Sequence, residues 1–163
     1  MTFKHERRIP PVLWAVVADR SQARVLSAPW PRADSWEEVA ELVCADGALA
    51  PHEAYTDGPG TFADVAGGHH AGEDQTDFRH QTAGRFAGEI VDVLEKGRAN
   101  GEFGRLLLVA PPLFLGVLRK KLPAPLSNMV ILELDKDYSQ AKPEEIRRRL
   151  QGELAAHAGS IKA

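Results

Sequence analysis

The sequence predicts an α/β protein with a ribonuclease H-like mixed sheet, element order βββαβαβα and three layers. Three observations predict this class. An apolar, β-branched run opens the fold at Val12–Ala18, two more strand-like segments follow before any helical period, and two later apolar runs each lead into a helix. A run of strands followed by strand-helix alternation is typical of a mixed sheet covered by helices.

The first three segments predict an antiparallel meander. Val12–Ala18 is continuously apolar, as expected of a central strand that is covered on both faces. Asp19 ends it, "DRSQ" forms a tight turn, and "ARVLS" returns as the second strand. The proline-marked bend "PWPRADS" then precedes a third strand around "WEEVAELVC".

Residues 45–82 follow neither the period of a strand nor that of a helix. They contain seven acidic residues, one arginine and no lysine. Because the segment is much longer than an ordinary connection, we predict a long acidic loop that is functional or mobile and leads into the main helix.

The second half predicts helices and parallel strands in alternation. A long helix takes over around Gln75, because apolar residues recur at helical spacing until "NG" at Asn100 and Gly101. "RLLLVA" and "NMVILELD" are buried-strand signals. The helices "PPLFLGVLRKKL" and "KPEEIRRRLQGELAAH" follow them, and each has proline in its first turn.

Length and composition bound the class of protein. A chain of 163 residues with 44% hydrophobic and 26% charged residues predicts one globular domain over 1–163, with a structured core at about 12–155. The net charge of -3 argues against strong binding of free nucleic acid. No run approaches the roughly 20 apolar residues of a membrane span, so we expect no membrane partner.

The expected compartment is the cytoplasm. Cys44 is the only cysteine, which fits a reducing environment. The start "KHERR" followed by "IPPVLWAVVA" has the outline of a signal peptide. Pro10 and Pro11 interrupt that run, and it continues directly into the predicted hairpin. We therefore predict a buried first strand, and an exported adhesion factor is an alternative.

Two groups of residues form the candidate ligand site. Open α/β sheets place ligands at the carboxyl ends of parallel strands, and the long loop could close over that edge. The strand ends contribute Asp19, Pro111, Pro112, Asp135 and Asp137; the loop and main helix contribute His69, His70, His80 and Arg85.

Catalytic and metal chemistry have weaker signals, and we predict no catalytic residue, metal or cofactor. A two-metal nuclease would need converging carboxylates such as Asp19 and Glu89, but the fourth strand ends in "VAPP". The three loop histidines, with Asp64, Glu73, Asp74 and Asp77, are suitable metal ligands without a metal-binding spacing. A metal-dependent or esterase-like hydrolase using this His/Asp loop is an alternative.

Four segments together resemble a known family. "LWAVVADRSQARVLS", "DGPGTFADVAGG", "RFAGEIVDVLEKGRANGEFGRLLLVAPPLFLGVLRKKL" and "LELDKD" are similar, in this order, to the bacterial host attachment protein family. That family is in turn distantly similar to the middle domain of archaeal and eukaryotic peptide-chain release factors, which implies a ribonuclease H-like fold.

The resemblance also bears on the loop. Release factors carry a catalytic Gly-Gly-Gln loop followed by an Arg-Phe-Ala helix, and "GGHH" and "RFAG" occur here in the same order. His69 stands where the glutamine would be, so peptide release is not implied. We expect a non-enzymatic binding module for an unknown macromolecule, with the ribosome as the candidate that the resemblance suggests.

Overall fold

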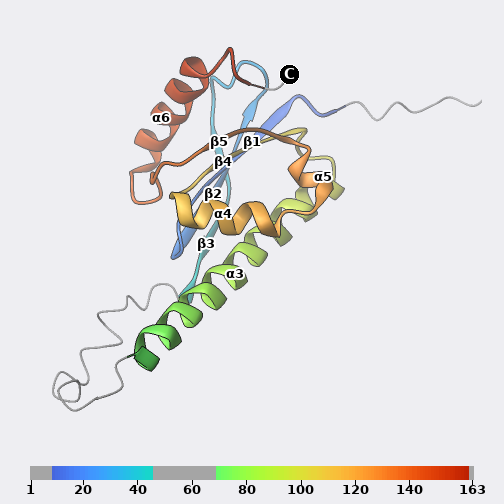
Figure 1. Ribbon diagram of the computed structural model, residues 1–163. Helices are drawn as coiled ribbons and strands as arrows, with labels where there is room; N and C mark the ends of the chain where they lie inside the picture. The colour runs from blue at the N-terminus through green and yellow to red at the C-terminus, as the bar shows by residue number, and fades with distance from the viewer. Residues whose placement is uncertain (1–8, 46–68, 162–163) are drawn as a thin grey trace, which may run out of the picture.

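The computed structural model describes residues 9–45 and 69–161, with the backbone alone for 69–76. A sheet lies between α3, α4 and α5 on one face and α6 on the other, which confirms the three-layer α/β class (Figure 1). The elements are β1 Val12–Ala18, β2 Gln22–Pro29, β3 Glu37–Val43, α3 His69–Ala99, β4 Arg105–Val109, α4 Pro112–Lys121, α5 Ala124–Ser127, β5 Val130–Leu134 and α6 Pro143–Ala156.

The sheet is mixed, with strand order β3-β2-β1-β4-β5. The first three strands pair antiparallel, whereas β1, β4 and β5 run parallel. The predicted meander and parallel half are therefore both present. The ribonuclease H-like order of the complete chain stays a prediction, because residues 46–68 lie outside the described part.

β1 is the central strand and is buried on both faces, as its sequence predicts. Trp14, Val16 and Ala18 pack toward α3 and α4. The alternate residues Leu13, Ala15 and Val17 pack toward α6. Because successive side chains of a strand point to opposite faces, one apolar run contributes to two cores.

The main helix begins earlier than predicted. α3 starts at His69 rather than around Gln75, so the last part of the predicted 45–82 loop is helical. Adding residues to an existing helix costs much less than nucleating one, and the strongly periodic region after Phe78 supplies that nucleus. The remainder of the predicted loop, 46–68, lies outside the described residues.

The end of α3 agrees with the prediction. Gly101 adopts a φ of 69°. Its N–H donates to Arg98 O, and the N–H of Glu102 donates to Gly97 O, at 3.0 and 2.9 Å. This is a Schellman cap, in which a left-handed residue closes the helix, and it explains the requirement for "NG" at this point.

Close packing fixes α3 against the sheet at Gly97. A Cβ atom there would lie 2.4 Å from Trp14 Cη2, so only glycine permits this approach. The Trp14 ring stacks on Phe103 with centroids 4.4 Å apart. This contact ties α3, β1 and the α3–β4 connection together near the amino ends of the parallel strands.

Proline marks the remaining helix boundaries. Pro112 and Pro143 occupy first helical turns, as predicted. Pro123 follows the end of α4 but also caps the short helix α5, which was not predicted. A four-residue helix is too short to show a helical period in the sequence.

Candidate functional site at the carboxyl edge of the sheet

Three chain segments meet where the parallel strands β1, β4 and β5 end, and we call this region the carboxyl edge (Figure 1). Asp19 follows β1, Ala110–Pro112 follow β4, and Asp135–Gln140 follow β5. The N–H of Ala110 donates to Leu134 O at 3.1 Å, which extends the pairing of β4 and β5 to the edge itself.

The Asp19 carboxylate organises the turn between β1 and β2. Its Oδ1 accepts hydrogen bonds from the backbone N–H and hydroxyl of Ser21, at 2.6 and 2.7 Å, and from the N–H of Gln22, at 2.9 Å. A carboxylate that accepts backbone N–H groups two and three residues ahead is typical of tight turns. The residue predicted to end β1 therefore also builds the turn.

The second carboxylate oxygen of Asp19 reaches the loop after β5. Asp19 Oδ2 accepts from Ser139 Oγ at 2.6 Å and from Gln140 Nε2 at 3.4 Å. In the opposite direction, Gln22 Nε2 donates to Ser139 O at 2.8 Å. These contacts join segments about 120 residues apart in the sequence and fix the loop that precedes α6.

Asp137 shares the same serine. Ser139 Oγ lies 2.7 Å from Asp137 Oδ1 as well as 2.6 Å from Asp19 Oδ2. A hydroxyl has one hydrogen, so it donates to one of these carboxylates at a time. The structure thus brings together two of the predicted site residues, Asp19 and Asp137, through a side chain that is only 2% exposed.

Asp19 is held in its ionised form. Burial raises the pKa of its carboxyl group, but hydrogen bonds from Ser139, Ser21 and Gln22 outweigh burial, and the net pKa lies below the ordinary value of 3.8. A general base works best with a pKa near the working pH. Asp19 therefore acts as a structural anchor for two loops.

Of the other predicted residues of this edge, Pro112 and Asp135 are exposed and Pro111 is partly buried. Pro111 caps α4 and Pro112 is its first residue. Leu113 follows them and is 88% exposed, the most exposed large apolar side chain among the described residues. Asp135 is exposed and forms no hydrogen bond or ion pair with any described residue.

Among the described side chains, no histidine joins these groups in a cluster. His69 and His70 are the first two residues of α3, and their side chains lie outside the described set. His80 and Arg85 are exposed on α3. No group of three or more histidine, cysteine or acidic side chains suited to a metal occurs among the described residues. The nuclease arrangement around Asp19 and Glu89 is thus absent there.

Ser139, Gln140 and Gln22 belong to the site but were not predicted. The pattern "DYS" could have identified Ser139, because aspartate often accepts a hydrogen bond from the residue two positions ahead. No sequence signal connects Gln22 with the loop after β5, since their contact depends on the strand order alone.

A comparison with protein-family models confirms the resemblance to the host attachment family. The family model described as "Protein required for attachment to host cells" matches residues 14–150, so the chain belongs to this family. No curated protein matches the sequence. Among solved structures, the archaeal translation termination factor aRF1 is similar with a TM-score of 0.40 and 12% identity. The match covers 91% of this chain and 41% of the termination factor.

Proposed function

We propose that this member of the host attachment family contributes to attachment to host cells by binding a macromolecular partner, without catalysing a reaction. The family description supplies the role in attachment. The observation that supports binding over catalysis is the hydrogen bonding of Asp19, whose two oxygens are both occupied by donors from two loops.

The polar groups that the structure describes at the carboxyl edge lack the arrangement of a catalytic site. Among the described residues, neither Ser21 nor Ser139 is hydrogen bonded to a histidine, and an activated serine needs a base within reach. Ser139 is also inaccessible to a substrate. The cluster instead gives the two loops one fixed conformation, which reduces the entropy lost when a partner binds.

An exposed apolar side chain lies beside the two fixed loops of the carboxyl edge. Leu113 projects from the first turn of α4, directly after Pro111 and Pro112, whose rings restrict the backbone there. A rigid backbone that presents an apolar group beside polar loops is suited to protein contact. We therefore place the partner-binding surface at the carboxyl edge, centred on Leu113.

Attachment assays with matched surface variants test this placement. A deletion strain is complemented with the wild-type gene, with Leu113→Ser or with Phe78→Ser, an exposed apolar residue of α3 that serves as control. We expect Leu113→Ser to reduce attachment several-fold at equal protein level and Phe78→Ser to leave it unchanged. Equal attachment by all three strains would refute the placement.

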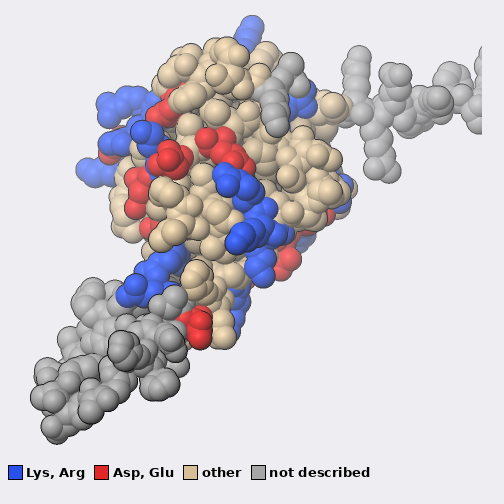
Figure 2. All heavy atoms as spheres, in the orientation of Figure 1, with Lys and Arg blue, Asp and Glu red and all other residues tan. Residues whose placement is uncertain are grey.

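The ribosome is one candidate for the macromolecular partner. Lys120 and Lys121, at the end of α4, are exposed and part of a basic surface, beside Arg119, which pairs with Glu133 at the surface (Figure 2). Such cations would meet ribosomal RNA, and binding through phosphates weakens as salt rises. Co-sedimentation with ribosomes at low salt that disappears at high salt would support this version. Absence from ribosomal fractions at low salt would exclude it.

We also propose that the protein acts from the cytoplasm. β1 is the central strand of the sheet, so cleavage of a signal peptide after Ala18 would remove the strand that pairs with both β2 and β4. Cys44, which is buried and is the only cysteine of the sequence, also fits a reducing compartment. Among the described residues, no helix is long and apolar enough to cross a membrane. Fractionation followed by determination of the N-terminal sequence tests the proposal, and a processed extracellular form would refute it.

A further inference from the structure

The helix α4 presents a continuous outward face between its exposed first turn and its cationic end. Its inward side chains are buried and hold the helix on the sheet; they are Phe114, Leu115 and Leu118. The residues of the opposite side follow the spacing i, i+3, i+4 and i+7, which places them in one row along the helix. This row, which we call the α4 ridge, consists of Leu113, Gly116, Val117 and Lys120.

The middle of the α4 ridge is open. A Cβ atom on Gly116 would meet nothing within 4 Å, so space lies above the helix backbone there. Leu113 is 88% exposed on one side of this gap, and Val117 on the other side packs partly against the core. An apolar projection beside a gap is a shape into which a side chain of a second helix can pack.

The end of the α4 ridge is positively charged. Lys120 and Lys121 are exposed, and neither forms an ion pair with any described residue, whereas the neighbouring Arg119 pairs with Glu133 of β5. Lys121 lies along α3, because its Cε is 3.6 Å from the position of a Cβ atom on Gly84. Figure 2 shows the basic side chains at this end of α4. A local positive charge is therefore present on a protein with a net charge of -3.

The other end of the α4 ridge lies at the carboxyl edge, where the charge is negative. Asp135 is exposed at that edge and forms no hydrogen bond or ion pair with any described residue. From Leu113 to Lys120 the helix rises about 10 Å, at roughly 1.5 Å per residue. A partner that contacts both ends of the ridge therefore needs an apolar group near Leu113 and negative charge about two helical turns away, over the lysines.

A protein helix fits this arrangement better than other anionic partners. The interior backbone groups of an α-helix are hydrogen bonded within the helix, so α4 offers no strand edge to an extended segment. Two lysines are few for a phosphate backbone, because its binding depends on many charge contacts. A lipid surface needs more apolar area than the ridge exposes, since a single weak anchor gives only marginal membrane binding.

From these observations we propose that the α4 ridge binds an acidic amphipathic helix of a partner protein. An apolar side chain of that helix packs over Gly116, between Leu113 and Val117. Its carboxylates, about two turns away, pair with Lys120 and Lys121. This assignment rests on the proposed function of the carboxyl edge as a partner-binding surface, and it adds the chemistry of the partner.

Titration of the full chain by fluorescence anisotropy tests the charge preference. The probe is a labelled synthetic helical peptide with leucines along one face and glutamates in its last turns, and its twin carries lysines in place of the glutamates. We expect the acidic peptide to bind at least roughly tenfold more tightly than the basic twin at low ionic strength, because the sign of the charge contacts is reversed. Equal affinity for the two peptides, or failure of both to bind at millimolar concentration, would overturn the proposal.

Variants of the α4 ridge locate the binding. Lys120→Glu together with Lys121→Glu should remove the preference for the acidic peptide, and arginine at both positions should keep it. Gly116→Gln fills the gap and should weaken the acidic peptide several-fold without lowering the melting temperature, because replacing a glycine inside a helix favours folding. Gly152→Gln, at an exposed position of α6 with equal space, is the matched control. Unchanged binding in both the double glutamate variant and Gly116→Gln would refute the site.

Attachment assays at equal protein level separate this proposal from the proposed function. If Leu113→Ser reduces attachment but Lys120→Glu with Lys121→Glu leaves it unchanged, the carboxyl edge remains the binding surface and the acidic helix is overturned. Co-sedimentation of the protein with phosphatidylglycerol vesicles or with ribosomal RNA at physiological salt, lost in the double glutamate variant, would assign the lysines to phosphate groups. That result would also overturn the acidic helix.

Discussion

The two ends of the parallel strands differ in how their polar groups are used. At the carboxyl edge, both carboxylate oxygens of Asp19 accept hydrogen bonds from donors of two loops. The charged group therefore has a structural role. At the amino ends of β4 and β5, which we call the amino edge, the buried Nε of Arg105 has no hydrogen-bond partner among the described residues. Residue type alone therefore does not show how a charged group is used, because the hydrogen bonds around it decide that.

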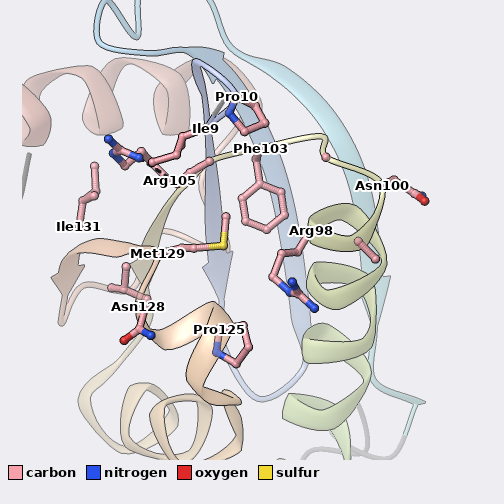
Figure 3. Close-up of a pocket in the computed structure, with 14 residues that line it drawn as sticks. Ile9, Pro10, Arg98, Asn100, Phe103, Arg105, Pro125, Asn128, Met129 and Ile131 are labelled. Atoms are coloured by element: carbon pink, nitrogen blue, oxygen red, sulfur yellow. Dashed lines mark hydrogen bonds between the residues drawn. The ribbon is translucent and has the colours of Figure 1, made fainter. Parts of the chain in front are cut away.

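The difference has a physical origin in the connections. The β1–β2 turn and the loop after β5 are short and polar. Asp19 accepts hydrogen bonds from backbone N–H groups of the turn and from the side chains of Ser139 and Gln140 in the loop. The amino edge is formed by close packing of Gly97, Trp14 and Phe103. Phe103 also lines the hollow that lies at this edge (Figure 3).

Among the substitutions proposed here, one that disrupts the packing of the amino edge should lower the free energy of unfolding most. Gly97→Ala places a Cβ about 2.4 Å from the rigid Trp14 ring, and overpacking of this kind costs up to about 3 kcal/mol in the free energy of unfolding. Gly88→Ala, in the same helix with nothing within 4 Å, should stabilise the protein by up to about 1 kcal/mol. Urea denaturation compares the two, and equal effects would contradict the packing described.

Removing the Asp19 carboxylate at the carboxyl edge should cause the next largest loss of unfolding free energy. Asp19→Ala leaves the N–H groups of Ser21 and Gln22 without their acceptor and should cost about 2 kcal/mol of unfolding free energy. Asp135→Ala removes an exposed carboxylate without described contacts and should change that free energy by less than about 0.5 kcal/mol. Similar losses for both variants in chemical denaturation would show that Asp19 does not anchor the loops.

Acid should weaken the carboxyl edge selectively. The pKa of Asp19 is lower in the folded protein than its ordinary value of 3.8. The ionised group therefore contributes stability above about pH 4, and this contribution is lost as the pH falls through the folded pKa. The difference in unfolding free energy between wild type and Asp19→Asn should be constant from pH 7 to 5 and shrink below pH 4. A difference that grows below pH 4 would be evidence against the anchoring hydrogen bonds.

The surface of the carboxyl edge should show the smallest effect on stability. Leu113 is 88% exposed, so Leu113→Ser should change the free energy of unfolding by less than about 0.5 kcal/mol. Thermal unfolding measures this directly. A larger loss of unfolding free energy would mean that Leu113 packs against the rest of the protein. Reduced attachment by the Leu113→Ser strain could not then be assigned to a lost partner contact.

Much of the fold could be predicted because local patterns carry it. The apolar run of β1, the proline starts of α4 and α6 and the "NG" end of α3 each reflect one physical requirement. The beginning of α3 at His69 could not be predicted, since helix extension into a weakly patterned segment depends on the helix that follows.

The site was only partly predictable. The strand order places Asp19 and Asp137 at one edge, as the carboxyl-end rule anticipates. The serine that joins them has no pattern linking it to β1. The hollow at the amino ends of β4 and β5 had no sequence signal, because only the pairing of β4 with β5 and the packing of α3 bring the segments that line it to one edge of the sheet.

The most direct measurement is attachment by a strain that produces Asp19→Asn, normalised to the amount of folded protein. Asparagine keeps the size of the side chain and one acceptor oxygen, but its amide nitrogen cannot accept a hydrogen bond from Ser139, and it cannot act as a base or nucleophile. If the carboxyl edge works as a fixed binding surface, attachment per folded molecule should fall by no more than a few-fold, because one acceptor is lost. A loss of about a hundredfold or more in the folded protein, the size expected when a general base is removed, would contradict a binding role without catalysis.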